Sequence, residues 1–311
     1  MESVIEVTHL KKHFKDVKAV DDISFTVQKG ELFGFLGVNG AGKTTTIQML
    51  TTLFPPTEGN VSICNLELGK ENEQIKHHIG VVAQNNRLDS RLTVQENLLL
   101  RGGLYQRSRK KLKENLSQVS EILTLTDVLT RPYGKLSGGQ KRRVEIAAAL
   151  MHIPKILFLD EPTTGLDPAT RKQVWSAVSN LQKELQMTVF LTTHYMEEAA
   201  KADHIAILNK GKLVEYGTPF SLKEKYAKDT LRLIPTQENR TALLHLLKQA
   251  NLNYYQKENS YLITIDSTLS ALPLLEQGKT LLQGFEVIQG TMDDVFLNAM
   301  KERSDFLCLS I

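Results

Sequence analysis

The sequence predicts an α/β protein with a largely parallel, buried sheet, followed by a smaller α+β domain. Short apolar runs alternate with helical patterns over residues 1–220, and this alternation is typical of parallel sheets that are covered by helices. One of these runs, residues 32–36, ends at a glycine-rich loop after which a helical pattern begins. The tail has the order strand, helix, strand, strand, helix, strand, which is the ferredoxin-like pattern.

The predicted elements divide the chain into a first domain over residues 1–220 and a second over residues 221–311. Apolar and polar side chains alternate at 4–8 and 23–28, as they do in half-buried strands. Helical periodicity from about residue 85 to residue 150 predicts a helical subdomain inserted into the sheet domain. The other predicted elements are strands at 32–36, 61–64, 79–82, 156–160, 188–192, 205–208, 231–234, 253–257, 260–265 and 285–289, and helices at 237–250, 269–277 and 292–301.

Charge and composition exclude several classes of protein. The 38 basic and 35 acidic residues leave a net charge of +3, too even a balance for a dedicated nucleic-acid binder. Cys64 and Cys308 lie far apart without metal-ligand spacing, so we expect neither a disulfide nor a cysteine metal site. The N-terminus lacks the pattern of a signal peptide, and Glu145, Pro154 and Lys155 interrupt the most apolar stretch. We therefore expect any role at a membrane to depend on a partner.

The motif GVNGAGKT at residues 37–44 has the pattern G-x-x-x-x-G-K-[ST] of a phosphate-binding loop. Its glycines allow successive backbone N–H groups to turn toward phosphate oxygens, and the following helix adds its positive N-terminal end. We expect Lys43 to reach the β- and γ-phosphates of a nucleotide and the Thr44 hydroxyl to bind Mg²⁺. The residues predicted to bind ATP in this loop are Gly37, Asn39, Gly40, Ala41, Gly42, Lys43, Thr44 and Thr45.

The run ILFLDE at residues 156–161 supplies the acidic partners of this loop. An apolar strand ends at Asp160, and ligands of open α/β sheets bind at the carboxyl ends of the strands. We expect Asp160 to lie on the Mg²⁺ side of the nucleotide. Glu161 is one residue further on, so its side chain points in another direction, and we predict that it polarises a water beside the γ-phosphate.

The run LSGGQ at residues 136–140 is the signature of ATP-binding-cassette (ABC) ATPases, and residues 1–220 resemble that family. The resemblance implies a RecA-like P-loop NTPase core with a helical insertion subdomain. It also implies that Gln84 touches the metal and lines the groove toward a membrane partner, and that His194 contacts the γ-phosphate. Phe14 stands where the family places an aromatic ring that stacks on adenine, and phenylalanine keeps the π-face of the more common tyrosine.

The same resemblance implies a head-to-tail dimer, formed with a second copy or with a homologous ATPase subunit. In this arrangement the signature of one subunit faces the γ-phosphate held by the other, which uses the start of a helix as an anion site. The residues expected to contact the partner's ATP are Ser137, Gly138, Gly139, Gln140 and, in the D-loop, Asp167. The simplest interpretation of Lys141, Arg142 and Arg143 is a solvated helix face; a second is that they help to balance phosphate charge.

Two short motifs resemble the daunorubicin-type drug-resistance exporters. They are TTGLDP at residues 163–168 and GTMDDVFLNAM near the C-terminus. This branch implies an ATPase on the cytoplasmic face of a bacterial membrane that works with a separate integral-membrane permease. Residues 86–98 are a candidate contact surface for a permease helix, or an ordinary solvated loop and helix start. The basic run RSRKK at 107–111 is a solvated helix face or lies near anionic lipid.

A soluble ABC ATPase acting on nucleic acid or ribosomes is the alternative function. Such proteins usually carry two cassettes in tandem or long coiled-coil insertions, whereas this chain has one phosphate loop, one signature and no sustained heptads. A nucleotide-binding regulator without turnover is a third possibility, which the presence of Glu161 and His194 argues against.

Overall fold

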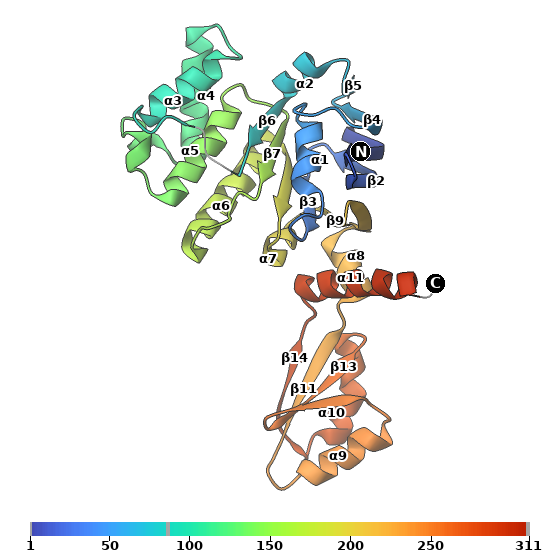
Figure 1. Ribbon diagram of the computed structural model, residues 1–311. Coiled ribbons are helices and arrows are strands. Elements are labelled where there is room, and N and C mark those ends of the chain that lie inside the picture. The colour runs from blue at the N-terminus through green and yellow to red at the C-terminus, as the bar shows by residue number, and fades with distance from the viewer. Residues whose placement is uncertain (1, 85–87, 309–311) are drawn as a thin grey trace. The chain divides into compact units, whose positions relative to one another are not determined.

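The computed structural model describes residues 2–84 and 88–308 of the chain, and Figure 1 shows its elements. It divides into two compact units, Met1–Thr218 and Pro219–Ile311, with the division two residues before the predicted boundary. Among the described residues the first unit contains two sheets and the second contains one, and each unit has its own hydrophobic core.

A six-stranded sheet forms the centre of the first unit and confirms the predicted α/β architecture. Its strand order is β10-β9-β3-β8-β7-β6, and all neighbours are parallel except the edge pair β10 and β9. Every residue of β3, β7 and β8 is buried, which explains why these strands are continuous apolar runs in the sequence. The strands are β3 Leu32–Gly37, β6 Ile79–Val82, β7 Ile156–Asp160, β8 Thr188–Thr193, β9 His204–Asn209 and β10 Lys212–Gly217.

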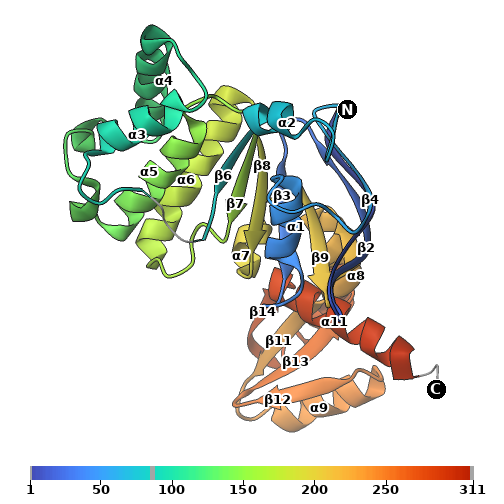
Figure 2. The same cartoon turned by 45° about the horizontal axis from the view of Figure 1, so that its top comes forward.

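The N-terminal strands form a separate antiparallel sheet, which the prediction of one largely parallel sheet did not include. Its order is β2-β1-β4-β5, and every neighbouring pair is antiparallel. The apolar faces of these strands pack with β3, β7, β8 and β9 into one core, and Figure 2 shows helix α1 between the two sheets. The strands are β1 Ser3–Phe14, β2 Val17–Gln28, β4 Glu58–Ile63 and β5 Leu66–Glu67, and α1 spans Lys43–Leu50.

Aromatic rings fill the space between these two sheets. Phe190 is fully buried, and its ring centroid lies 5.1 to 6.1 Å from those of four neighbours, Phe25, Phe33, Phe35 and Phe158. Ring pairs at these separations add to the stabilisation that the burial of apolar area supplies. This core supports the strand ends that carry the phosphate loop and the acidic residues.

The helices α5 and α6 lie on the opposite side of the central sheet from α1 (Figures 1 and 2). The predicted helical segment forms α3, α4 and α5, with two short 3₁₀ turns between α4 and α5. No helix of the described residues is both long enough and apolar enough to cross a bilayer. The helical elements of this unit are α2 Asn72–His78, α3 Val94–Gly103, α4 Arg109–Ile122, η1 Thr126–Val128, η2 Tyr133–Lys135, α5 Gly138–Leu150, α6 Pro168–Leu185 and α7 Met196–Ala199.

The second unit has the predicted ferredoxin-like topology. Its sheet order is β12-β13-β11-β14 and each neighbouring pair is antiparallel, which is the arrangement of two interleaved β-α-β units. The inward side chains of β11 and β13 pack with α9 and α10 into the second core. The elements are α8 Pro219–Tyr226, β11 Asp229–Pro235, α9 Arg240–Gln249, β12 Tyr254–Lys257, β13 Ser260–Ile265, η3 Thr268–Ala271, α10 Leu272–Gly278, β14 Leu282–Ile288 and α11 Met292–Cys308.

Candidate active site

The phosphate loop connects β3 to α1, as its sequence predicts. Gly42 has φ +106°, and a Cβ atom there would lie 2.4 Å from the carbonyl oxygen of Ala19, so the position requires glycine. Lys43 is the first residue of α1 and is buried, and its Nζ donates to the carbonyl oxygens of Gly37 (2.7 Å) and Val38 (3.2 Å). Burial lowers the pKa of Lys43, whereas the nearby carboxylates Glu161 and Asp160 act in the opposite direction.

The rest of the loop lies at the surface of the unit. Asn39, Gly40 and Thr44 are exposed, Thr45 is half-buried, and Ala41 is buried. This leaves the helix start and the Thr44 hydroxyl accessible to a ligand. Phe14, at the end of β1, is 44% exposed, and its ring forms a T-shaped pair with that of Phe54 at 6.2 Å between centroids.

Asp160 is the last residue of β7 and Glu161 follows it, and the hydroxyl of Thr192, near the end of β8, joins the two residues. This hydroxyl donates to Asp160 Oδ1 at 2.6 Å and accepts from the Glu161 N–H at 3.0 Å. Glu161 has φ +46°, a left-handed conformation that costs energy for a residue with a side chain. The Thr192 hydroxyl therefore fixes the Asp160 carboxylate and the Glu161 backbone, and the turn at Glu161 directs its own carboxylate elsewhere.

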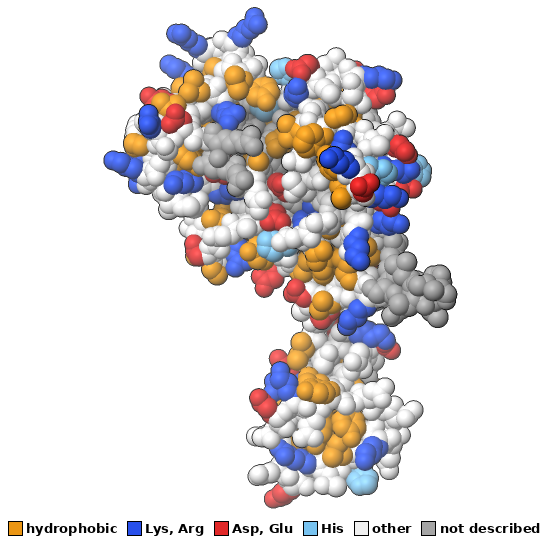
Figure 3. Space-filling view, viewed as in Figure 1, with side chains coloured by type: hydrophobic (Ala, Val, Ile, Leu, Met, Phe, Trp, Pro, Cys, Tyr) orange, Lys and Arg blue, Asp and Glu red, His pale blue; other side chains and the backbone are white. Residues whose placement is uncertain are grey.

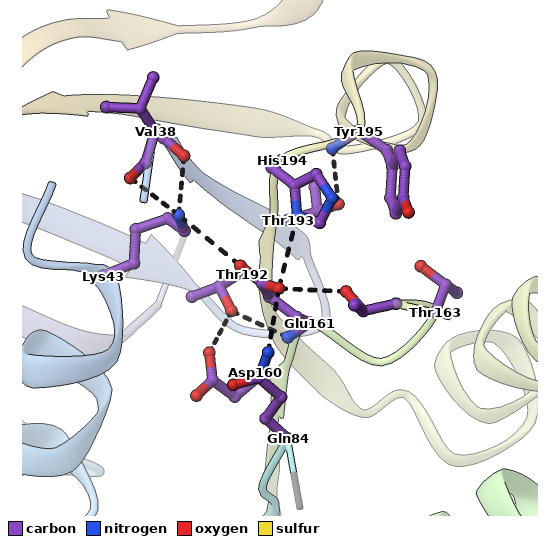
Figure 4. A network of polar contacts seen from close by, with 12 residues as sticks. Val38, Lys43, Gln84, Asp160, Glu161, Thr163, Thr192, Thr193, His194 and Tyr195 are labelled. Carbon is purple, nitrogen blue, oxygen red and sulfur yellow. Dashed lines mark hydrogen bonds and ion pairs between the residues drawn. The ribbon is translucent and has the colours of Figure 1, made fainter. Parts of the chain in front are cut away.

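Four polar side chains converge on the Glu161 carboxylate (Figure 4). Oε2 lies 3.4 Å from Gln84 Nε2 and 3.4 Å from His194 Nδ1, and it accepts a hydrogen bond from the Thr164 hydroxyl at 3.0 Å. Oε1 lies 3.8 Å from Lys43 Nζ. The structure thus brings together the predicted residues from four separate parts of the sequence, around a carboxylate that is largely shielded from water.

A second carboxylate connects the segments on either side of this cluster. Glu198, in α7, is buried and accepts hydrogen bonds from the hydroxyls of Thr163 (2.5 Å) and Thr193 (2.7 Å). Thr163 precedes Thr164, and Thr193 precedes His194. Glu198 therefore ties together the two backbone segments that present side chains to Glu161.

The signature and D-loop residues form a separate group on α5 and α6. Ser137 caps α5 and exchanges hydrogen bonds with Gln140, and Asp167 caps α6. A Cβ atom on Gly139 would lie 2.4 Å from Thr170 Cγ2, so the signature glycine allows close contact between the two helix starts. Ser137, Gly138 and Asp167 are exposed, and α5 lies across the central sheet from α1 (Figure 1).

The interpretation of Lys141, Arg142 and Arg143 as a solvated face is wrong for Arg142. Arg142 is 7% exposed and donates to three backbone carbonyl groups and to Glu145. Arg143 is half-buried and donates to the carbonyl oxygens of Leu123 and Thr124, and burial lowers its pKa. Both guanidinium groups satisfy carbonyl oxygens at the ends of other elements, which the helical pattern of α5 alone could not reveal.

A groove of about 580 Å³ runs beside the residues predicted to bind the nucleotide. Thr44 and Asp160 line one part of it, and Arg101, Leu104 and Tyr105, at the end of α3 and just after it, line another. Of the candidate permease contact 86–98, residues 86 and 87 lie outside the described residues, and Leu88 lines the groove. The basic residues 107–111 are exposed, and Figure 3 shows Lys and Arg side chains projecting at the top, where Figure 1 places α4.

Sequence reasoning missed several residues that organise the site, namely Thr192, Thr164, Glu198 and Arg142. Thr192 offered the best signal, since it lies in the last two residues of a buried strand and pairs with Asp160 of β7. Polar residues of an open α/β sheet meet at these carboxyl ends. For Glu198 and Arg142 the partners lie in other segments, and their helices alone gave no comparable signal.

Comparisons with known proteins agree with this geometry. A family profile described as ABC transporter matches residues 20–164. The daunorubicin/doxorubicin resistance ATP-binding protein DrrA of Streptomyces peucetius is 35% identical over 301 residues, which cover 94% of this chain and 91% of DrrA. The chain belongs to the ABC transporter ATP-binding proteins.

Other members of the family differ in length. The probable multidrug ABC transporter ATP-binding protein YbhF of Escherichia coli (strain K12) is 40% identical over 228 residues, or 73% of this chain and 39% of YbhF. The matched segment thus covers well under half the length of YbhF. A dimeric structure of the ATP-binding cassette MJ0796, bound to ADP and Pi, superposes with a TM-score of 0.62 at 27% identity and covers 69% of this chain and 98% of that cassette. The predicted ABC ATPase fold is confirmed.

Proposed function

We propose that this chain is the ATP-binding and ATP-hydrolysing subunit of a bacterial ABC exporter, which powers efflux of an antibiotic or other amphipathic compound through a separate permease. The observation that carries the proposal is the position of Glu161, whose carboxylate meets Lys43, Gln84 and His194 beside the phosphate loop. The resistance named for DrrA and the multidrug transport named for YbhF support the choice of export.

ATP would bind with its phosphates at the start of α1. The residues proposed to hold it are Gly37, Asn39, Gly40, Ala41, Gly42, Lys43, Thr44 and Thr45, with Phe14 against the adenine. Lys43 already points its ammonium group toward the loop carbonyls and Glu161, so it needs little rearrangement to meet the β- and γ-phosphates. Lys12 Nζ lies over the half-exposed Phe14 ring at 5.2 Å from its centroid, so adenine would stack on the other face or displace this side chain.

The residues proposed to bind Mg²⁺ suit a hard cation. Thr44, Asp160 and Gln84 offer a hydroxyl, a carboxylate and an amide oxygen, which are the oxygen ligands that Mg²⁺ prefers. Gln84 uses its Nε2 toward Glu161, which leaves the amide oxygen for the metal, and Thr44 and Asp160 line the same groove. Among the described residues no cluster of three His, Cys, Asp or Glu forms a metal site. When bound, Mg²⁺ would neutralise charge on the β- and γ-phosphates.

Hydrolysis would depend mainly on positioning and charge stabilisation. Glu161 would accept a hydrogen bond from the attacking water and polarise it. His194 and Gln84, both within 3.4 Å of the same carboxylate oxygen, would fix the position of that carboxylate beside the γ-phosphate. Since the carboxylate is 13% exposed, the electrostatic effect of these neighbours is stronger than it would be in water.

Thr192→Val should slow hydrolysis about tenfold at saturating ATP, because the buried hydroxyl that holds both Asp160 and the Glu161 backbone is lost. Steady-state ATPase assays over a range of Mg²⁺ concentrations would measure this change. Thr188→Val, at the other end of β8, is the matched control and should leave kcat within about twofold. Equal loss of kcat in the two variants would contradict the role given to Thr192.

The second half of each ATP site would come from another subunit, either a second copy or a homologous ATPase. Ser137, Gly138, Gly139 and Gln140 lie at the start of α5, and Asp167 caps the adjacent helix. Ser137, Gly138 and Asp167 are the exposed members of this group, and they present two neighbouring helix starts at the surface. Such a surface suits the γ-phosphate of an ATP held by the partner. The dimeric form of MJ0796 supports this arrangement.

The groove beside Asp160 is the proposed docking site for the permease, at the cytoplasmic face of the membrane. It joins the Mg²⁺ residues to an exposed apolar rim that includes Leu104, which is 73% exposed. A permease helix in this groove would contact the segment next to Gln84 and so sense the nucleotide. Large exposed apolar side chains around a groove are typical of an interaction site.

Co-purification with a membrane protein tests this proposal. The chain, co-expressed with the polytopic membrane protein encoded beside it, should sediment with membranes and confer resistance that is lost when either gene is deleted. Leu104→Glu should abolish the association, because it places a charge in the apolar rim. Leu100→Glu, on the preceding turn of α3 and 63% exposed, does not line the groove and should keep it. Recovery of the chain on ribosomes or DNA instead would favour the alternative, a soluble ABC ATPase acting on nucleic acid.

A further inference from the structure

Arg142 lies at the point where α5 meets the carboxyl ends of β6 and β7. Its Nε donates to the carbonyl oxygen of Pro162 at 2.7 Å, and its Nη2 donates to that of Asp160 at 3.2 Å. Its Nη1 donates to the carbonyl oxygen of Ala83 at 3.0 Å and to Glu145 Oε2 at 2.7 Å. One rigid, planar guanidinium thus joins four groups from three segments.

The carbonyl groups of Asp160 and Pro162 lie on either side of Glu161. Glu161 has φ +46°, and a left-handed conformation in a residue with a side chain persists only where its surroundings hold it. Thr192 binds the N–H of this residue, and Arg142 binds the carbonyl groups before and after it. Arg142 therefore helps to hold the turn that directs the Glu161 carboxylate.

The third carbonyl group belongs to Ala83, the residue before Gln84. The Gln84 side chain approaches the Glu161 carboxylate to 3.4 Å. Through Nη1 and Nη2, the same guanidinium therefore fixes the backbone next to Gln84 and next to Glu161, whose side chains meet at the site. Because Arg142 is 7% exposed, water competes little for these hydrogen bonds.

Glu145 and Tyr133 hold the guanidinium in this orientation. Glu145 Oε2 pairs with Arg142 Nη1, and Glu145 Oε1 accepts from the Tyr133 hydroxyl at 2.9 Å. Glu145 also lines the groove beside Asp160, so a bound partner would lie next to the residue that orients Arg142. Both Tyr133 and Glu145 belong to the helical segment, whereas the three carbonyl groups belong to the turns after β6 and β7.

We propose that Arg142 is a positioning residue that holds Glu161 and Gln84 in the arrangement needed for hydrolysis and links both to α5. The inference rests on the proposed ATPase function. Since α5 begins at the signature, which serves the partner subunit's ATP, Arg142 connects that site to the hydrolytic site of its own chain. Movement of α5 changes the hydrogen bonds on both sides of Glu161.

The variant Arg142→Gln tests the inference in the full-length chain, with Arg143→Gln as the matched control. Arg143 is the adjacent arginine on the same helix, and its partners Leu123 and Thr124 lie away from the site. Arg142→Gln should lower kcat about 30-fold while the dissociation constant for ATP, measured with a fluorescent ATP analogue, changes less than about threefold. Arg143→Gln should lower the midpoint of thermal unfolding and keep kcat within about twofold.

Arg142→Lys and a double variant separate positioning from stability. Lysine keeps a buried cation beside Glu145 but cannot bind three carbonyl groups in one plane, so kcat should stay at least about fivefold low in a folded protein. In a Glu161→Gln background, Arg142→Gln should cause almost no further loss, because Arg142 acts through Glu161.

Wild-type kcat in Arg142→Lys, equal loss of kcat in the two arginine-to-glutamine variants, or a full further loss in the double variant would each overturn the inference. Failure of the proposed ATPase function can be distinguished from failure of this inference about Arg142. In the first case the wild type and Arg143→Gln would also lack ATPase activity.

Discussion

Glu161→Gln should retain ATP binding and lose about 10²- to 10⁴-fold in ATP turnover, the range expected when a general base is removed. Glutamine has nearly the same shape as glutamate, so the turn after β7 and the contact with Thr164 can persist. It lacks the negative charge that faces Lys43 at 3.8 Å and that we propose polarises the attacking water. The loss should therefore appear in kcat, with little change in the affinity for ATP.

Single-turnover hydrolysis and equilibrium binding of ATP would measure the two effects separately. Glu197→Gln is the matched control, because Glu197 is an exposed glutamate on α7 close in sequence to His194. It should hydrolyse ATP at the wild-type rate. Hydrolysis by Glu161→Gln at the wild-type rate would show that another group activates the water, and the assignment of Glu161 would be wrong.

The sequence predicted the central sheet well because its strands are buried on both faces. Strands such as β3 and β8 have six buried residues each and are bounded by glycines or polar residues, so their pattern is unambiguous. The separate sheet of β1, β2, β4 and β5 was not predicted, because strand pairing depends on partners distant in sequence. Ile5 in β1, for example, pairs with Ile63 in β4.

The residues of the site also fall into those that the sequence predicted and those that it did not. Spacing alone identified Lys43, Thr44 and the strand end at Asp160, because phosphate binding requires these residue types at fixed offsets. Arg142 could not be recognised in this way, since an arginine on an amphipathic helix is usually solvated. Its burial depends on Pro162, 20 residues away in sequence, and on Ala83, 59 residues away. The residues proposed to contact the ligand have a local signature, and those proposed to position them do not.

A mixed dimer of two inactive variants should regain ATPase activity if the signature acts on the partner's nucleotide. Lys43→Ala removes the ammonium group from the phosphate loop. Gly138→Asp places a negative charge at the start of α5, where a Cβ atom would have room, since the nearest atom is Leu166 Cδ2 at 3.6 Å. Each variant alone should be inactive, because like charges repel at the anion site and the phosphates lose their lysine.

In the mixed dimer, the intact loop of the Gly138→Asp chain meets the intact signature of the Lys43→Ala chain, which restores one of the two sites. Equal mixing should give about a quarter of the wild-type rate, because about half of the dimers contain both chains. Two different affinity tags would isolate these dimers and verify that the chains have exchanged. If each site were instead completed within one chain, neither subunit would hold an intact site, and verified mixed dimers would be as inactive as their parents. The recovery of activity on mixing therefore separates a shared site from two independent ones.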